Sequence, residues 1–160
     1  MTKRFVACFY GQGGIATSFG IYLMARRLRA MGFEVQTYRY RADIDLAARD
    51  IDQKTRSGYL ISGLGYSLGC SSLSLLQTRR KFELAVFLAE SSLAINYPIN
   101  HANTKHSVLV HGPDFLSDAG IKLGFDERFY TPSLHLWIDF DPGVWKVVED
   151  QFGRLLKLSQ

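Results

Sequence analysis

A serine between two glycines is the clearest chemical signal in this chain of 160 residues. The run Gly65-Tyr66-Ser67-Leu68-Gly69 has the pattern G-x-S-x-G, with an apolar stretch before it and a helical pattern after it. Such a strand-to-helix turn lifts the serine hydroxyl above a sheet edge, and side chains at the glycine positions would crowd the turn. The motif predicts Ser67 as a nucleophile and the Leu68 amide as an oxyanion donor. The alternative is a glycine-rich turn with an incidental serine.

A serine needs a general base to become a nucleophile, so the histidines are the next candidates. The chain has four of them, His101, His106, His111 and His135. In enzymes with this serine turn the base comes last in the chain, after the serine and the acid. We therefore predict His135 as the base, with a packed core histidine as the alternative. His111 ends an expected strand, where a structural hydrogen bond is the alternative role.

The carboxylate that would orient the histidine has several candidates. Glu90 ends an expected strand and Asp114 follows the next one, so both would lie at the carboxyl edge of the sheet. Asp118 and Asp126 lie further along an expected loop. Asp141 suits a helix cap better than a catalytic role. The residues themselves leave Glu90 and Asp114 open as the acid.

A second glycine turn follows the first expected strand, in Tyr10-Gly11-Gln12-Gly13-Gly14. The Gln12 amide there would join that of Leu68 as the second donor of an oxyanion hole. Continued to Ala16, the same turn also fits G-x-G-x-x-A, the dinucleotide fingerprint. Arg39 and Arg41 would then meet the 2′-phosphate of a phosphorylated dinucleotide. This alternative leaves the Ser67 turn unexplained.

Alternating strand and helix patterns would position these residues. The expected strands are Arg4–Tyr10, Glu34–Tyr40, Tyr59–Leu64, Leu84–Leu88, Ser107–Val110 and a short last one near Leu134–Ile138. The expected helices are one from Ile21 to Gly32, one capped by Asp43, one around Leu73 to Leu76, and one that starts at Asp141-Pro142. Ser91–Thr104 and Phe115–Tyr130 are expected loops. The alternation predicts a three-layer α/β/α fold with a mainly parallel sheet, in one domain over residues 1–160.

Composition narrows the function classes. Net charge is +4, 47% of residues are hydrophobic and 21% are charged, all ordinary for a globular domain. No nucleic-acid motif is present, and no apolar run is long enough for a membrane span, so we expect neither partner. The histidines and cysteines lack metal-ligand spacing, and we expect no metal and no cofactor. Two cysteines, Cys8 and Cys70, and no signal-peptide pattern favour the cytoplasm.

The chain resembles a group of short bacterial α/β-hydrolase-fold proteins that are lipase- or esterase-like. The resemblance spans nearly the whole chain and is carried by Gly11–Gly14, Thr17–Gly20, Leu28–Gly32, Gly65–Gly69 and His135–Asp139. It implies a minimal α/β-hydrolase architecture without a cap domain. In these proteins the fourth strand commonly ends in Asp, and Glu90 stands at the matching place here. The resemblance therefore favours Glu90 as the acid.

The expected function is a serine hydrolase, most simply an esterase, that acts on a small-molecule or lipid-like ester. Ser67, His135 and Glu90 would form the triad, and Gln12 and Leu68 the oxyanion hole. Two other functions remain as alternatives. One is an inactive binding protein of the same fold, and the other is the dinucleotide-binding module.

Overall fold

A parallel sheet lies at the centre of the molecule. The computed structural model describes residues 2–11, 18–88, 97–112, 123–133, 138 and 140–157. Its strands are β1 Arg4–Tyr10, β2 Glu34–Arg39, β3 Leu60–Tyr66, β4 Leu84–Leu88, β5 Ser107–His111 and β6 Glu127–Tyr130. They form one six-stranded sheet in the order β2-β1-β3-β4-β5-β6, in which every neighbouring pair is parallel.

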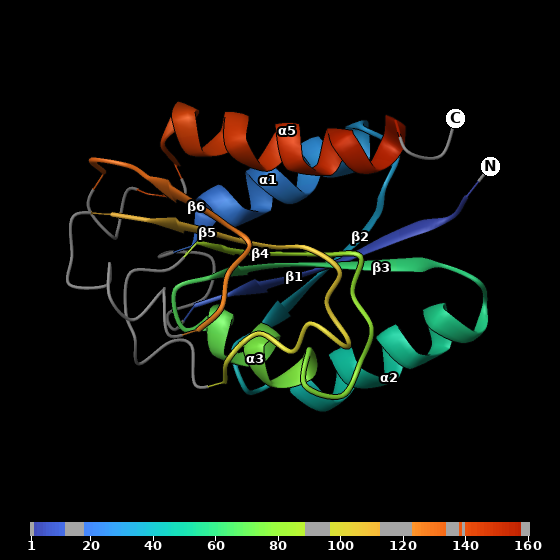
Figure 1. The fold of residues 1–160 in the computed structure, drawn as a ribbon. Helices are drawn as coiled ribbons and strands as arrows, with labels where there is room; N and C mark the ends of the chain where they lie inside the picture. Colours follow the sequence, from blue (N-terminus) through green and yellow to red (C-terminus); the bar gives the residue numbers. More distant parts are fainter. Residues whose placement is uncertain are drawn as a thin grey trace.

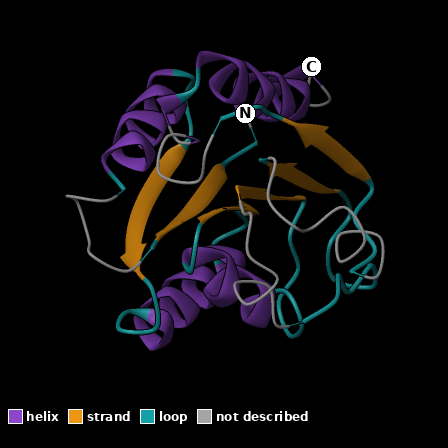
Figure 2. Cartoon of the chain, turned by 90° about the vertical axis from the view of Figure 1, so that its left-hand side faces the viewer, coloured by secondary structure: helices purple, strands orange, loops and turns teal. Residues whose placement is uncertain are grey.

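Helices cover both faces of this sheet (Figures 1 and 2). On one face lie α1 (Phe19–Ala30) and α5 (Pro142–Lys157), and on the other lie α2 (Ile44–Arg56) and α3 (Gly69–Leu76). The predicted three-layer α/β/α architecture with a parallel sheet is confirmed. No helix in the described part of the chain is long and apolar enough to cross a membrane.

β1 shows why the first apolar run becomes a central strand. All seven of its residues are buried. Val6 and Cys8 pack on the side of α1 and α5, and Ala7 and Phe9 pack on the side of α2 and α3. A strand that is covered on both faces needs apolar residues at nearly every position. At the sheet edge, β2 has several exposed residues instead, which matches its polar alternation.

The chain changes direction across the sheet between β1 and β3. From β1 it steps to β2 on one side, and it then returns to β3 on the other. In open parallel sheets such a switch leaves a crevice beyond the carboxyl ends of the two strands. Gly11 follows β1 and Ser67 follows β3 at this crevice. In the dinucleotide-binding fold, with strand order 3-2-1-4-5-6, two strands lie beyond the first one. In the sheet formed by the described residues, only β2 lies beyond β1.

The last strand among the described residues, β6, is one that the sequence did not predict. β6 is Glu127–Tyr130, at the end of the segment Phe115–Tyr130 that we expected to be a loop. Of the expected strand Leu134–Ile138, the structure describes only Ile138, which lies in a short helical turn. Exposed and half-buried residues alternate along β6, as an edge strand requires. Two of its four residues are charged, so the strand becomes recognisable only through its pairing with β5.

Asp43 precedes α2 at the predicted cap position but does not cap the helix. Its carboxylate instead accepts hydrogen bonds from the backbone amide of Arg39, at 2.8 Å, and from the Arg39 guanidinium, at 3.2 Å. The side-chain bond from Arg39 is the main reason why the pKa of Asp43 is lowered. The predicted side-chain cap is therefore wrong, because the preceding strand end supplies a charged donor for the same carboxylate.

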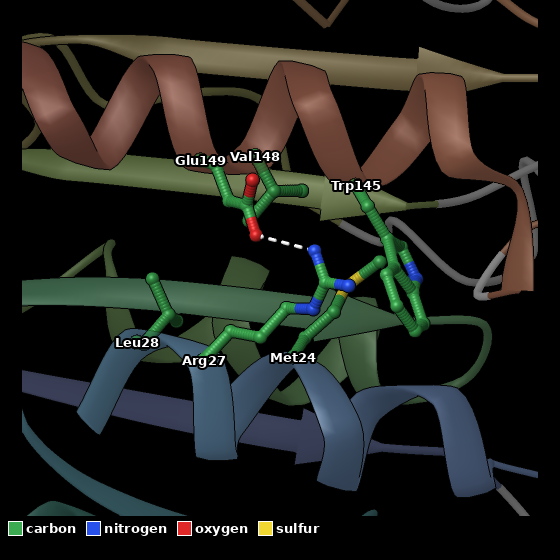
Figure 3. A pocket seen from close by; sticks show the side chains of 6 residues that line it. All are labelled: Met24, Arg27, Leu28, Trp145, Val148 and Glu149. Carbon is green, nitrogen blue, oxygen red and sulfur yellow. Dashed lines mark hydrogen bonds and ion pairs between the residues drawn. The ribbon is translucent and has the colours of Figure 1, made fainter. Parts of the chain in front are cut away.

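The contact between α1 and α5 closes one face of the fold (Figure 3). Arg27 of α1 donates a hydrogen bond to Glu149 of α5 at 2.7 Å. The guanidinium carbon of Arg27 also lies 4.1 Å from the ring centre of Trp145, in cation–π contact. Arg27 and Glu149 are 122 positions apart in the sequence, so no local sequence pattern predicts their contact.

Asp141 starts α5, as predicted from the sequence. One of its carboxylate oxygens accepts hydrogen bonds from the amides of Gly143, at 2.7 Å, and Val144, at 3.4 Å. The other oxygen accepts from the hydroxyl of Ser133 and from that of Thr131, the latter at 2.6 Å. These two hydroxyl bonds are the main reason why the pKa of Asp141 lies below its usual range. Asp141 thus ties the start of α5 to the segment that follows β6.

Asp141→Ala removes the cap, and we expect it to lower the free energy of unfolding by about 1–2 kcal/mol. The folded pKa of Asp141 is lowered. Its ionised form therefore contributes stability that is fully present above the unfolded pKa, about 3.9, and is lost as the pH falls through the folded value. Urea denaturation from neutral to acid pH measures this loss, which should be smaller in Asp141→Asn.

Asp150→Ala is the matched control for this prediction. Asp150 pairs with Lys146 on the exposed surface of α5, where ion pairs contribute little. Its removal should change the free energy of unfolding by less than about 0.5 kcal/mol. If both alanine variants lost the same stability, the cap at Asp141 would not have the role assigned to it.

Candidate active site

Ser67 has a strained backbone at the junction of β3 and α3. Its φ is +52°, a left-handed value that one other described non-glycine residue, Arg41, shares. The amide of Ser67 donates to the carbonyl of Leu88, the last residue of β4, at 3.0 Å. Its carbonyl accepts from the amide of Cys70 at 2.9 Å. These bonds hold a conformation that costs an L-residue roughly 1–2 kcal/mol, and such strain gathers at functional sites.

Both glycines of the motif are required by close backbone contacts. A Cβ on Gly65 would lie 3.0 Å from the Cα of Cys70, in the first turn of α3. A Cβ on Gly69 would lie 2.3 Å from the carbonyl oxygen of Phe9, in β1. Neither backbone atom can move without disturbing the sheet or the helix. The crowding predicted for this turn is present in the fold.

The amide of Leu68 lies directly before α3, next to Ser67. Leu68 has helical angles, φ −59° and ψ −19°, directly before α3. Its carbonyl accepts from the amide of Ser71, but within the described part of the chain its own amide donates no hydrogen bond. Negative charge is favoured at a helix N-terminus. A preorganised donor beside the nucleophile is the arrangement that oxyanion stabilisation requires.

Gly11 brings the end of β1 against Ser67. A Cβ on Gly11 would lie 3.1 Å from the Cβ of Ser67 and 3.3 Å from its Oγ. The amide of Gly11 donates to the hydroxyl of Ser18, a buried residue directly before α1, at 3.3 Å. The first glycine turn therefore begins beside Ser67, and Ser18 fixes the amide of its first residue.

His101 and His106 lie at the opposite end of the sheet from Ser67. His106 directly precedes β5, with its Nε2 3.1 Å from Glu127, and the Nδ1 of His101 lies 3.8 Å from Asp126. Both carboxylates stand at the amino end of β6, whereas Ser67 follows the carboxyl end of β3. Five strand residues span about 16 Å. This separation excludes both histidines and the candidate acid Asp126 from direct contact with Ser67.

His111 is the described histidine at the carboxyl edge. Its Nδ1 lies 3.2 Å from the carbonyl oxygen of Gly112, so this nitrogen donates and carries the proton. Its ring packs edge-on against Tyr130, with 5.8 Å between the centres. His111 ends β5, two strands or about 10 Å from β3, and its ring packs toward Tyr130 of β6, on the side away from Ser67. These contacts fit the structural role that the sequence left open.

The remaining predicted site residues lie outside the described residues. They are Gln12, Glu90, His135 and the alternative acids Asp114 and Asp118. The structure does describe the strand ends that precede two of them. β4 ends at Leu88, two positions before Glu90, and β5 ends at His111, three positions before Asp114. Both strands end at the same edge as β3, on the left in Figure 1.

The cysteines do not compete with Ser67 as nucleophiles. Cys8 and Cys70 are free and fully buried. Burial raises the pKa of Cys8 to about 12 and also raises the pKa of Cys70, so neither forms a thiolate at neutral pH. Within the described ranges, no cluster of three histidine, cysteine or acidic side chains is arranged to hold a metal ion.

The dinucleotide alternative needs Arg39 and Arg41 to bind a phosphate, but both side chains contact other groups of the protein. The guanidinium of Arg39 is bound to Asp43 at 3.2 Å. The guanidinium of Arg41 lies over the ring of Tyr40, 5.1 Å from its centre. Together with the strand order, these contacts disfavour a phosphate site at the end of β2.

Comparison with known proteins identifies the fold. No protein-family profile and no curated protein matches the sequence. Among solved structures, the ydeN gene product from Bacillus subtilis has a TM-score of 0.64 at 13% identity, over 94% of this chain and 100% of the other. A proposed hydrolase of the α/β superfamily (XCC1541) from Xanthomonas campestris has a TM-score of 0.66 at 10% identity, over 97% and 99%. Human thioesterase 2 has a TM-score of 0.63 at 10% identity, over 99% and 98%.

The chain therefore has the α/β-hydrolase fold over nearly its whole length. The architecture implied by the sequence resemblance is confirmed. At 10–13% identity the likeness is one of fold, and the chemistry must be argued from the residues of this chain.

Strain at Ser67 can be measured by two substitutions at this position. Ser67→Gly and Ser67→Ala both remove the hydroxyl, but only glycine relieves the left-handed backbone. We expect Ser67→Gly to be more stable than Ser67→Ala by about 1 kcal/mol, measured by chemical denaturation. The same pair at Ser62, a buried residue inside β3, should show the opposite order. Equal stability of the two Ser67 variants would refute the strain.

Proposed function

We propose that this protein is a serine hydrolase that cleaves carboxylic esters with Ser67 as its nucleophile. The observation that carries the proposal is the left-handed backbone of Ser67 between β3 and α3, beside the Leu68 amide, which donates no hydrogen bond within the described residues. The α/β-hydrolase fold supports it, and one neighbour of that fold is named a thioesterase. Esters and thioesters are cleaved by the same acyl-enzyme chemistry.

In the first half of the proposed reaction, the Oγ of Ser67 attacks the carbonyl carbon of the ester. The Ser67 proton passes to the imidazole of His135, and the carbonyl oxygen becomes an oxyanion that the amides of Leu68 and Gln12 stabilise. Collapse of this intermediate breaks the bond to the alcohol oxygen. The departing alkoxide takes the proton from His135 and leaves an acyl group on Ser67.

In the second half, a water molecule attacks the acyl carbonyl carbon and gives a proton to His135. A second oxyanion forms in the same donor pair and then collapses, which breaks the bond to the Ser67 oxygen. The carboxylic acid leaves, and His135 returns the proton to Ser67. Glu90 orients His135 and stabilises its charged form, with Asp114 as the alternative acid.

Two features of the fold support this assignment of roles. The nucleophile and the first glycine turn meet at the switch between β1 and β3, where parallel sheets bind ligands. Of the four histidines, His101 and His106 stand at the other edge and His111 is about 10 Å away laterally. These positions favour His135 as the base, as does its place after the serine and the acid in the chain.

A fluorophosphonate probe tests the activated serine directly. We expect the wild-type protein to be labelled, Ser67→Ala to be unlabelled, and His135→Ala to be labelled about 100-fold more slowly or worse, because the base is lost. In-gel fluorescence against time measures the rates. The matched control is His106→Ala, which removes a histidine at the amino edge and should keep the wild-type rate. A folded wild type that resists the probe would favour the inactive binding protein.

The acid is decided by comparing Glu90→Gln with Asp114→Asn. Each change removes one negative charge and preserves the shape of the side chain. The variant of the true acid should lower kcat by about 10³- to 10⁴-fold, since the histidine loses its orienting partner. The other variant should stay near wild type. Hydrolysis of a chromogenic ester measures both rates, and two near-normal variants would remove both residues from the triad.

A further inference from the structure

An open hollow of about 290 Å³ lies at the carboxyl edge of the sheet, between β5, β6 and the start of α5. Its apolar walls come from Val110 of β5, Phe129 of β6, Pro132, and Val144 and Val147 of α5. Tyr130, which is 63% exposed, stands at its rim. The hollow is smaller than a pocket for a whole drug-sized ligand, which suits part of a substrate.

Two polar side chains that line the hollow, Asp141 and Thr131, are hydrogen-bonded to each other. The carboxylate of Asp141 accepts hydrogen bonds from two hydroxyls and two amides, and the hydroxyl of Thr131 is one of these donors. A carboxylate with both oxygens engaged in this way does not demand a cation or a polar head group. The hollow is otherwise lined mainly by apolar side chains, so burial of apolar surface is the main contact that it offers a ligand.

The sheet connects this hollow with Ser67. Tyr66 pairs with Leu88, Leu88 pairs with Val110, and Val110 pairs with Phe129, so one row of residues crosses from β3 to β6. Ser67 follows Tyr66, and its amide is bound to the carbonyl of Leu88. With about 4.8 Å between strands, the wall at Val110 begins about 10 Å from the strand of the nucleophile.

A second set of contacts, near the starts of α1 and α5, also leads from Ser67 to the hollow. Ser18, which holds Gly11 beside Ser67, is followed by Phe19. The ring of Phe19 stacks on that of Phe140, with 6.4 Å between the centres. Phe140 in turn precedes Asp141 at the hollow. Phe19 is 48% exposed and Phe140 is 39% exposed, so this ring pair leaves an apolar surface open where α1 begins and just before α5.

We propose that this hollow seats the acyl chain of the substrate, and that the protein prefers esters of medium-length aliphatic acids. The inference rests on the proposed function and adds the substrate class to it. With its carbonyl at Ser67, an acyl chain runs along the carboxyl edge, crosses the exposed Phe19–Phe140 pair and ends against Val110, Val144 and Val147. An acetyl group is too short to leave the vicinity of Ser67.

The experiment compares hydrolysis of p-nitrophenyl octanoate and p-nitrophenyl acetate by wild type and Val147→Trp. Val147 is half-buried on the α5 wall, so the larger side chain fills the hollow. Each buried methylene strengthens binding about fourfold. We expect the wild type to have the higher kcat/KM for octanoate, and Val147→Trp to lower the octanoate-to-acetate ratio by about tenfold or more.

Lys146→Trp is the matched control, because it adds the same side chain to α5 at a position whose side chain is 76% exposed. Its ratio should stay at the wild-type value. Pro132→Phe narrows the hollow from an exposed position on the other wall, and it keeps the test valid if Val147→Trp does not fold. It should lower the ratio as well.

The outcomes separate the two proposals. An unchanged ratio in the folded Val147→Trp or Pro132→Phe variant, with acetate still hydrolysed, would overturn the acyl site and leave the serine hydrolase intact. An equal fall in Lys146→Trp would also overturn it. A wild type that cleaves neither ester would overturn the hydrolase itself, and the acyl site with it.

Discussion

The turn at Ser67 sets how closely β1, β3, β4 and α3 approach one another. To enter α3 directly from β3, the backbone takes a left-handed angle, and the amide of Ser67 is held by the last carbonyl of β4. The approach of α3 to β1 is so close that a Cβ on Gly69 would meet the carbonyl of Phe9. Three strands and one helix therefore hold one strained residue. A conformation fixed from several sides can persist despite its cost, and it keeps a reacting group in position.

The two edges of the sheet have different chemistry. At the amino edge, His106, Asp126 and Glu127 bind one another and their neighbours, so these polar side chains stabilise the ends of β5 and β6. At the carboxyl edge, the amide of Leu68, which directly follows the half-buried Ser67, donates no hydrogen bond to any described residue. A ligand gains most from donors that the fold leaves unused, and this favours the carboxyl edge as the place of the proposed chemistry.

α5 combines a structural role with the proposed binding role. Its inner residues close one face of the core, and Arg27 joins it to α1 through Glu149 and Trp145. Its first turn is fixed by Asp141, whose carboxylate satisfies the polar groups around it. The wall of the hollow is therefore rigid and apolar. A rigid wall loses little entropy when a chain binds, so even a modest apolar contact can discriminate between acyl lengths.

The sequence by itself determined the alternation of strands and helices, the turn at Ser67 and the cap at Asp141, because each depends on residues a few positions apart. The sequence did not predict β6, because its charged residues form a strand only by pairing with β5. It also predicted that the Asp43 side chain caps α2, whereas this carboxylate binds Arg39. Only the tertiary structure decided which histidines lie far from Ser67 and which apolar side chains surround a hollow. Those properties depend on the order of strands in the sheet. The residue pattern along the chain does not specify this order, so it does not give the distances between segments that are far apart in the sequence.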